Sequence, residues 1–326
     1  MKQSPRVSFV VPCYNYGRFL PDCLASILNQ QGEQDIEVIA IDDGSTDNSR
    51  DVLESVKDSR MRVVVHPRNL GHVATVNEGF LLARGCYIAR IDPDDRYRSC
   101  FLAATLPLLE AHPEVGLVYG DAAIIDDQGR VTQETSDSVH GGRDFKGNLF
   151  LHLLEVNSIC APTAIARRDA WLKALPVPES LAFNDWYFNI MMARHYEFYF
   201  VARVVADYRV HASNHHTKVG RDRTEEPSIF FLLEQIFGER ESSEELQLAK
   251  RNARHRIYAR HYFTLADKYF GMGMNADARR CYSAALRHRP SYALNAGLQR
   301  RLAATIVGRH VYEAGKNLVK NLPVRN

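Results

Sequence analysis

Short apolar runs rich in β-branched residues alternate with segments of helical periodicity over the first 120 residues of the chain. The strand-like runs are residues 7–11, 36–41, 62–65, 87–91 and 115–119. Between them, apolar residues recur at helical spacing in residues 19–28, 47–56, 71–83 and 101–111. A strand, a helix and a second strand within about 40 residues form a right-handed unit with parallel strands. The pattern predicts an α/β fold with an open, doubly wound, mostly parallel sheet covered on both faces.

Polar segments follow the ends of these strands. They are residues 12–15, 42–45, 68–69 and 92–95. In an open α/β sheet, ligands bind outside the carboxyl ends of the strands. We therefore expect these four segments to converge in space and to form one site.

The second part of the chain changes character twice. Residues 126–147 are polar and contain three glycines before the last position, which predicts a hairpin-like excursion and a mobile loop. Strand-like stretches at 157–166 and 198–208 flank helical segments at 170–175 and 183–195, and residues 218–227 predict a charged linker. Beyond Ser228 the strand signals stop. We expect one α/β domain over residues 1–220 and an all-α region over residues 228–326.

One segment of the C-terminal region resembles a tetratricopeptide-like helical hairpin. Small residues let two helices pack closely, and a proline ends the second helix. The matching positions are Tyr269, Gly273, Ala278, Tyr282, Ala285, Leu286 and Pro290. A solenoid needs about three such repeats. A single repeat predicts a helical appendage and not an array.

Cysteine usage and hydropathy favour a cytoplasmic protein. The six cysteines include no C-x-x-C pair, which argues against a disulfide framework or a zinc site. The first residues do not resemble a secretory signal. No apolar run approaches the roughly 20 residues of a spanning helix.

Charge is distributed unevenly along the chain. The formal net charge is +2, but residues 250–326 carry +13 and residues 1–249 carry −11. Basic tails attract anionic membranes or nucleic acid. Residues 302–322 mix apolar with basic positions. We expect no nucleic acid partner and a peripheral position on the inner face of the membrane; a solvated helical surface, or pairing with the acidic half of the chain or of a second copy, remains open.

Three carboxylates, Asp92, Asp94 and Asp95, follow the strand-like run 87–91 and form what we call the acidic loop, residues 92–95. Such a group is stable only with a cation or a ring of hydrogen-bond donors beside it. Oxygen ligands suit Mg²⁺ or Mn²⁺, which often complete their shells with substrate phosphates. The alternative is a plain acidic turn.

Six segments in series resemble family 2 glycosyltransferases with the GT-A fold. They read VSFVVPCYN, IAIDDGSTD, RNLGHVATVNEGF, ARGCYIARIDPDD, NDW and YRVH, and span about residues 7–216. The resemblance implies inverting transfer from a nucleotide-diphospho-sugar, with a UDP-sugar favoured. The acceptor would be a saccharide or a lipid-linked saccharide in cell-surface polysaccharide or glycan synthesis, bound by loops such as 136–147 and 157–163.

The resemblance also assigns roles to residues. Donor-binding positions would be Pro12, Tyr14, Asp42, Asp43, Arg68, Asn69, Asp92 and Arg209. A divalent ion, Mn²⁺ or Mg²⁺, would be held by Asp94, Asp92 and His211. Asp185 matches the general base of the family, but Asn184 stands where the family usually has a first carboxylate.

Two rival functions remain at this stage. A sugar nucleotidylyltransferase also uses a nucleotide, a divalent ion and an α/β sheet, but normally begins with a Gly-rich, Arg-containing loop, whereas this chain has Pro12 to Asn15. The other rival is a non-catalytic sugar-nucleotide-binding scaffold, against which Asp94 and Asp185 argue.

Overall fold

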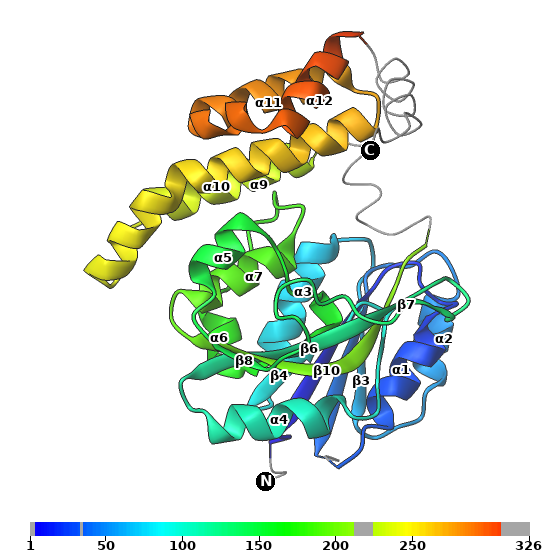
Figure 1. Ribbon diagram of the computed structural model, residues 1–326. Helices are drawn as coiled ribbons and strands as arrows, with labels where there is room; N and C mark the ends of the chain where they lie inside the picture. Colours follow the sequence, from blue (N-terminus) through cyan, green and yellow to red (C-terminus); the bar gives the residue numbers. More distant parts are fainter. Residues whose placement is uncertain (1–3, 33–34, 212–223, 308–326) are drawn as a thin grey trace, which may run out of the picture. The chain divides into compact units, whose positions relative to one another are not determined.

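One mixed sheet is the framework of the N-terminal unit in the computed structural model, which describes residues 4–32, 35–211 and 224–307 (Figure 1). The order across the sheet is β3 (Met61–Val65), β2 (Ile36–Asp42), β1 (Val7–Cys13), β4 (Tyr87–Arg90), β9 (Ala164–Arg167), β6 (Val115–Ile125), β10 (Glu197–Arg209) and β5 (Arg96–Tyr97). Two short strands lie off this path: β7 (Val131–Gln133) pairs with β6, and β8 (Phe145–Gly147) with β10.

Most of the strands run parallel, as the sequence predicts. β1 pairs in parallel with both β2 and β4, β2 with β3, and β6 with β10. The exception in the interior is β9, which is antiparallel to β4 and to β6. Residues 157–166 were expected to be strand-like throughout, but the strand is restricted to β9 and follows a 3₁₀ turn, η1 (Ala161–Thr163). A short buried apolar run does not reveal where a strand begins or in which direction it pairs.

Helices cover both faces of the sheet. α1 (Leu20–Leu28), α2 (Ser49–Ser55) and α4 (Phe101–Ala111) share one apolar core with the strands. α3 (His72–Leu82), α5 (Phe150–Glu155), α6 (Arg168–Lys173) and α7 (Asn184–Ala193) form the second layer, and Figure 1 shows α4 and α5 to α7 on opposite sides. Phe80 stacks on Trp171 at 4.3 Å and meets Phe188 edge-on at 5.0 Å, which joins α3, α6 and α7. Burying side chains of this size contributes roughly 2–3 kcal/mol each.

The segment expected to be a mobile loop is instead anchored. The Asp121 carboxylate accepts hydrogen bonds from the amide and hydroxyl of Ser136, both at 2.8 Å. His140 stacks between Phe145 and Phe200 at 5.1 and 4.3 Å. Polar composition alone predicted mobility here, because the partners of these residues lie far away in the sequence.

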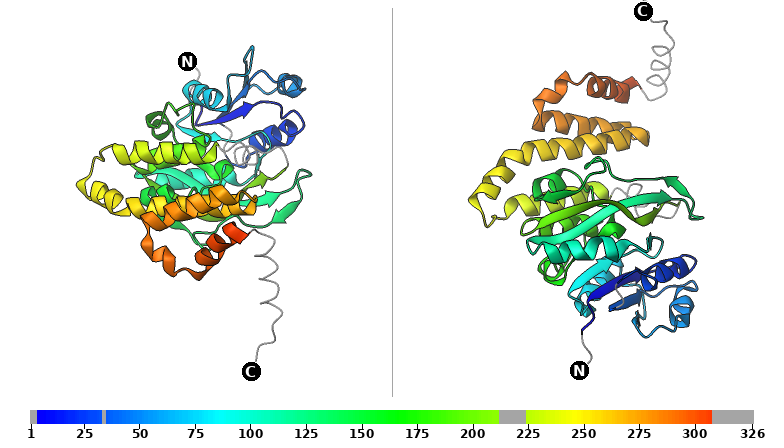
Figure 2. Two further views of the ribbon diagram at one scale, coloured as in Figure 1. Left: turned by 90° about the horizontal axis from the view of Figure 1, so that it is seen from above. Right: turned by 60° about the horizontal axis from the view of Figure 1, so that its bottom comes forward.

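The C-terminal unit, residues 229–326, is separate from the unit of residues 1–228 and contains only helices among its described residues. Its elements are α9 (Glu225–Gly238, which begins in the first unit), α10 (Glu244–Gly271), α11 (Asn275–His288), η2 (Pro290–Leu294) and α12 (Ala296–Val307). α10 and α11 lie side by side as a hairpin in both views of Figure 2. Gly273 turns between them at φ +77°, and Ala278 and Tyr282 are buried.

Among the described helices, none is both long and apolar enough to cross a membrane. Of the basic stretch 302–322, residues 308–322 lie outside the described part of the chain, as do residues 212–223 of the segment between the two units.

Candidate functional site

The segments at the strand ends converge as expected. The first two meet through Asn15, which has φ 61° and whose side-chain Oδ1 accepts from the amide of Thr46 at 2.8 Å. The amide of Asp43 donates to the carbonyl of Cys13 at 2.8 Å. The turn of residues 42–45, which we call the DDG turn, is therefore held directly against the end of β1.

The DDG turn also packs against residues 68–71, which we call the RNLG loop. A Cβ atom on Gly44 would lie 2.6 Å from the carbonyl carbon of Arg68, so only glycine fits there without a shift. The RNLG loop leads into α3, where His72 Nε2 lies 3.9 Å from Asp92 Oδ1 of the acidic loop. All four segments thus meet at one edge of the sheet.

The predicted donor-binding residues fall into two groups by exposure. Tyr14, Arg68 and Asn69 are exposed and can contact a ligand without rearrangement. Pro12 is buried within β1. Asp42 is also buried, and its Oδ1 accepts from the amide of Ser45 at 3.3 Å.

Asp43 is occupied by donors from the protein itself. Its carboxylate accepts from the amides of Leu70 and Gly71 at 2.8 and 2.9 Å. Its Oδ1 also lies 2.7 Å from Nδ1 of His66, whose Nε2 lies 2.7 Å from Glu78 Oε2. In this arrangement Asp43 fixes the RNLG loop to the DDG turn.

The acidic loop is buried and its negative charges are close together. Asp94 Oδ2 lies 3.0 Å from His211 Nε2, so the structure brings together two of the predicted metal ligands. Asp95 Oδ1 accepts from the Arg209 amide at 2.8 Å, whereas Asp95 Oδ2 has no hydrogen-bond partner among the described residues. Burial and then the charge of Asp92 raise the pKa of Asp94, against the lowering effect of His211. Burial, Asp94 and Asp92 raise the pKa of Asp95 well above its usual value.

Arg209, predicted to bind phosphate, lies behind the acidic loop. Its side chain is 2% exposed. Its Nε donates to the carbonyl of Asp94 at 2.6 Å, and Nη1 donates to the carbonyls of Asp126 and Asp127 at 3.1 and 3.3 Å. These contacts hold the backbone of the acidic loop in place.

The donor set fits a divalent cation. Within the described ranges, no group of three or more His, Cys, Asp and Glu side chains is already arranged around a common point. Asp94 and His211 are adjacent, but Asp92 is turned towards Arg90. The raised pKa values and the unpartnered Asp95 oxygen indicate negative charge that the protein does not compensate, which a bound cation would relieve.

Arg90, at the end of β4, links the acidic loop to the helix that carries Asp185. One guanidinium nitrogen donates to both oxygens of Asp92 at 2.7 Å, and another donates to Asn184 Oδ1 at 2.6 Å. The missing first carboxylate of the NDW segment is therefore replaced by an amide that accepts from a buried cation.

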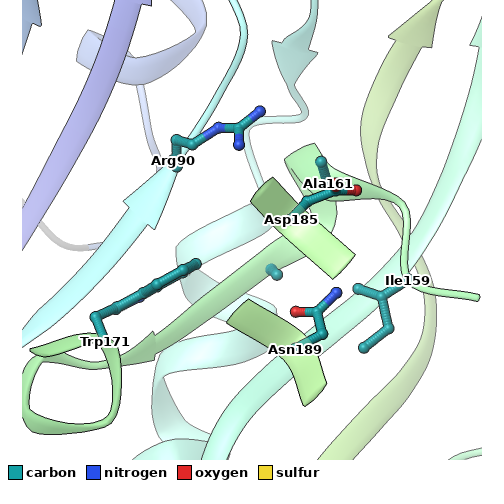
Figure 3. A pocket seen from close by; sticks show the side chains of 7 residues that line it. Arg90, Ile159, Ala161, Trp171, Asp185 and Asn189 are labelled. Carbon is teal, nitrogen blue, oxygen red and sulfur yellow. The ribbon is translucent and has the colours of Figure 1, made fainter. Parts of the chain in front are cut away.

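Asp185 is half-buried in the first turn of α7. Its Oδ2 accepts from Asn157 Nδ2 at 2.9 Å, in one of the loops expected to bind the acceptor. Figure 3 shows Asp185 beside Arg90 and Asn189 at a cavity of about 20 Å³, which has room for about one water molecule.

Sequence reasoning did not single out Arg90, His66 or Asn157. The signal for Arg90 was present, because a charged residue within an apolar buried strand needs a partner. For His66 and Asn157 no such signal existed, since their partners come from other segments of the chain.

Comparison with known proteins agrees with this architecture. The profile described as "Glycosyl transferase family 2" matches residues 8–175. An uncharacterized glycosyltransferase of Nostoc sp. is 26% identical over 233 residues, which are 68% of this chain and 70% of that protein. Glycosyltransferase GlyG of Streptococcus pneumoniae is 44% identical over 95 residues, 28% of this chain and 31% of GlyG.

Two solved structures share the fold. TarS of S. aureus in complex with UDP-GlcNAc superposes with a TM-score of 0.67 at 16% identity, covering 96% of this chain and 92% of that one. The mannosyltransferase PcManGT of Pyrobaculum calidifontis, in complex with GDP-Man and Mn²⁺, gives a TM-score of 0.59 at 18% identity, covering 98% and 89%.

The family match covers β1 to β4, β6 and β9, and therefore includes the DDG turn, the RNLG loop and the acidic loop. It removes the sugar nucleotidylyltransferase alternative. This chain belongs to glycosyl transferase family 2.

Proposed function

We propose that this chain transfers a sugar, with inversion of configuration, from a nucleotide-diphospho-sugar to a saccharide or lipid-linked saccharide, with a divalent metal ion as cofactor. The observation that carries the proposal is the acidic loop: Asp94 lies beside His211 in a buried pocket, while Arg90 connects Asp92 to the start of α7. Uncompensated carboxylates and a candidate base thus belong to one connected network.

The donor would bind along the converging strand ends. Exposed Tyr14 offers a ring for stacking on the base, and exposed Arg68 offers a cation to the phosphates. A UDP-sugar is the favoured donor, in keeping with UDP-GlcNAc bound to TarS; PcManGT, which binds GDP-Man, keeps GDP-sugars as an alternative.

Asp94, Asp92 and His211 would hold Mn²⁺ or Mg²⁺. When bound, such an ion neutralises negative charge on the departing diphosphate. Because Asp92 is paired with Arg90, its recruitment to the metal would require the Arg90 contact to loosen or to be shared. Arg209 contributes indirectly, by holding the Asp94 carbonyl and the Asp95 carboxylate in place.

Asp185 would accept the proton of the acceptor hydroxyl, leaving the oxygen free to attack the anomeric carbon. Asn157 holds one oxygen of this carboxylate and thereby orients the other. Because one base serves a single displacement, the configuration at the anomeric carbon inverts.

The place of the reaction would be the cytoplasmic face of a membrane, with synthesis of a cell-surface polysaccharide as its purpose. The basic C-terminal region supports this, since residues 250–326 carry +13. Sedimentation of the full-length protein with anionic and with neutral vesicles at low salt tests the placement, and a protein that ignores anionic vesicles refutes it.

The test of the function is a panel of UDP- and GDP-sugars, scored for nucleotide release with Mn²⁺ and with a chelator. We expect one donor class to be consumed only with the metal. With an α-linked donor and a suitable acceptor, the NMR coupling constant of the new anomeric proton should report a β linkage. Turnover in the chelator would refute metal dependence, and an α linkage would refute inversion.

A further inference from the structure

His66 is a buried histidine between two carboxylates, and the proposed reaction gives it no role. Its side chain is 7% exposed. Nδ1 lies 2.7 Å from Asp43 Oδ1 and Nε2 lies 2.7 Å from Glu78 Oε2. Asp43 is at the end of β2 and is 2% exposed, whereas the Glu78 side chain on α3 is 40% exposed.

This geometry determines the protonation state. Ionised carboxylates only accept hydrogen bonds, and a neutral imidazole has one donor. Both ring nitrogens of His66 can donate only when the ring is an imidazolium. Burial by itself would lower the pKa of His66, but the hydrogen bonds and charges of Asp43 and Glu78 outweigh it and raise this pKa.

The Asp43 carboxylate passes this interaction on to the RNLG loop. It accepts from the amides of Leu70 and Gly71 as well as from His66. Two exposed side chains of that loop, Arg68 and Asn69, are the ones proposed to meet the donor. The position of the loop therefore depends on a carboxylate whose own position depends on His66.

We propose that His66 is a positioning residue for the donor site: as an imidazolium it clamps Asp43, which holds the RNLG loop in the conformation that binds the nucleotide diphosphate. The inference rests on the proposed function, because it takes the RNLG loop as part of the donor site.

The direction of the pH dependence follows from the raised pKa of His66. A histidine with a raised pKa keeps its partners below its ordinary pKa of 6.5 and loses them as the pH rises through the raised value. Nucleotide affinity should therefore decline on the alkaline side of pH 6.5.

The experiment measures UDP binding to the full-length protein in the presence of Mn²⁺ by calorimetry between pH 6 and 9. For the wild type we expect the dissociation constant to rise about tenfold as His66 loses its proton, the scale of one lost charge-assisted hydrogen bond. The midpoint should coincide with the titration of the His66 Cε1 proton in NMR spectra, assigned by its absence from His66→Gln.

Three variants isolate the effect. His66→Gln should bind UDP weakly at low pH and lack the wild-type decline. Glu78→Gln removes only the outer carboxylate and should move both midpoints to lower pH, which remains testable should His66→Gln fold poorly. Glu54→Gln is the matched control, because Glu54 is similarly exposed and also pairs with a cation, Arg50 on α2; it should superpose on the wild type.

The outcomes separate the two proposals. A His66 titration that UDP affinity does not follow, or a wild-type decline that persists in His66→Gln, overturns the clamp while leaving the donor site intact. Failure of every protein to bind UDP or GDP at any pH overturns the donor site, and the clamp with it.

Discussion

The DDG turn and the acidic loop both follow buried strands and both carry adjacent aspartates, yet the protein treats their charges in opposite ways. Asp43 receives two backbone amides and an imidazolium. Asp95 receives one amide on one oxygen and, within the described residues, nothing on the other. Its pKa is raised by burial and by its neighbours Asp94 and Asp92.

The difference distinguishes a structural carboxylate from one that awaits a ligand. A buried charge surrounded by donors from its own chain needs nothing more. A buried group of like charges without such donors is unfavourable until a cation arrives. Substitutions in the acidic loop should therefore affect catalysis, and substitutions in the DDG turn should affect stability and loop position.

The largest effect is expected at Asp94. Asp94→Asn keeps the size of the side chain but removes the charge beside His211. Because a bound divalent ion supplies several kcal/mol of charge stabilisation, we expect kcat to fall by roughly 10³-fold or more. UDP binding should weaken in Mn²⁺ but equal that of the wild type in a chelator. Equal activity of the two proteins in Mn²⁺ would contradict the metal site.

Asp185 comes next, on the acceptor side of the same network. Asp185→Asn should lower kcat about 10²- to 10⁴-fold, because a base acts in the transition state, and should leave donor binding nearly unchanged. Asp169→Asn is the matched control, since Asp169 is likewise an aspartate in the first turn of a helix, α6. A change restricted to KM would make Asp185 a binding or capping residue.

The framework of this site was predictable, because it depends on local patterns. Strand-like runs followed by polar segments located the ends of β1, β2, β3 and β4, and the parallel topology then required those ends to meet. Asp94 and His211 were paired from the resemblance alone, and the structure has them in contact.

What could not be predicted depends on partners distant in sequence. Arg209 was expected to bind phosphate, since an exposed arginine near a diphosphate would do so, but its Nε and Nη1 donate to loop carbonyls. Asp43 was expected to contact the nucleotide, and its donors from residues 66–71 were not visible in the pattern. Its direct contact with a nucleotide stays a prediction.

Asp43→Asn tests the structural side of the comparison. The amide nitrogen would face either the Gly71 amide or the donors of Leu70 and His66, so one donor always meets another. We expect the free energy of unfolding to fall by about 2–4 kcal/mol, measured by urea denaturation. Asp51→Asn, at an exposed position of α2, should change it far less. Equal stability of both variants would mean that the Asp43 contacts are dispensable.

Asp95→Asn should change stability in the opposite direction. The substituted side chain retains an acceptor for the Arg209 amide, while its uncharged amide group replaces the unpartnered oxygen and removes repulsion from Asp94. In a chelator at pH 7 we expect the free energy of unfolding to rise by about 1 kcal/mol. Because the carboxyl pKa is raised above its usual 3.8, the Asp95 charge costs stability only as the pH rises from about that value towards the raised one. The gain should therefore disappear near pH 4. A loss of stability at pH 7 would show that the protein compensates this charge after all, and the contrast between the two turns would fail.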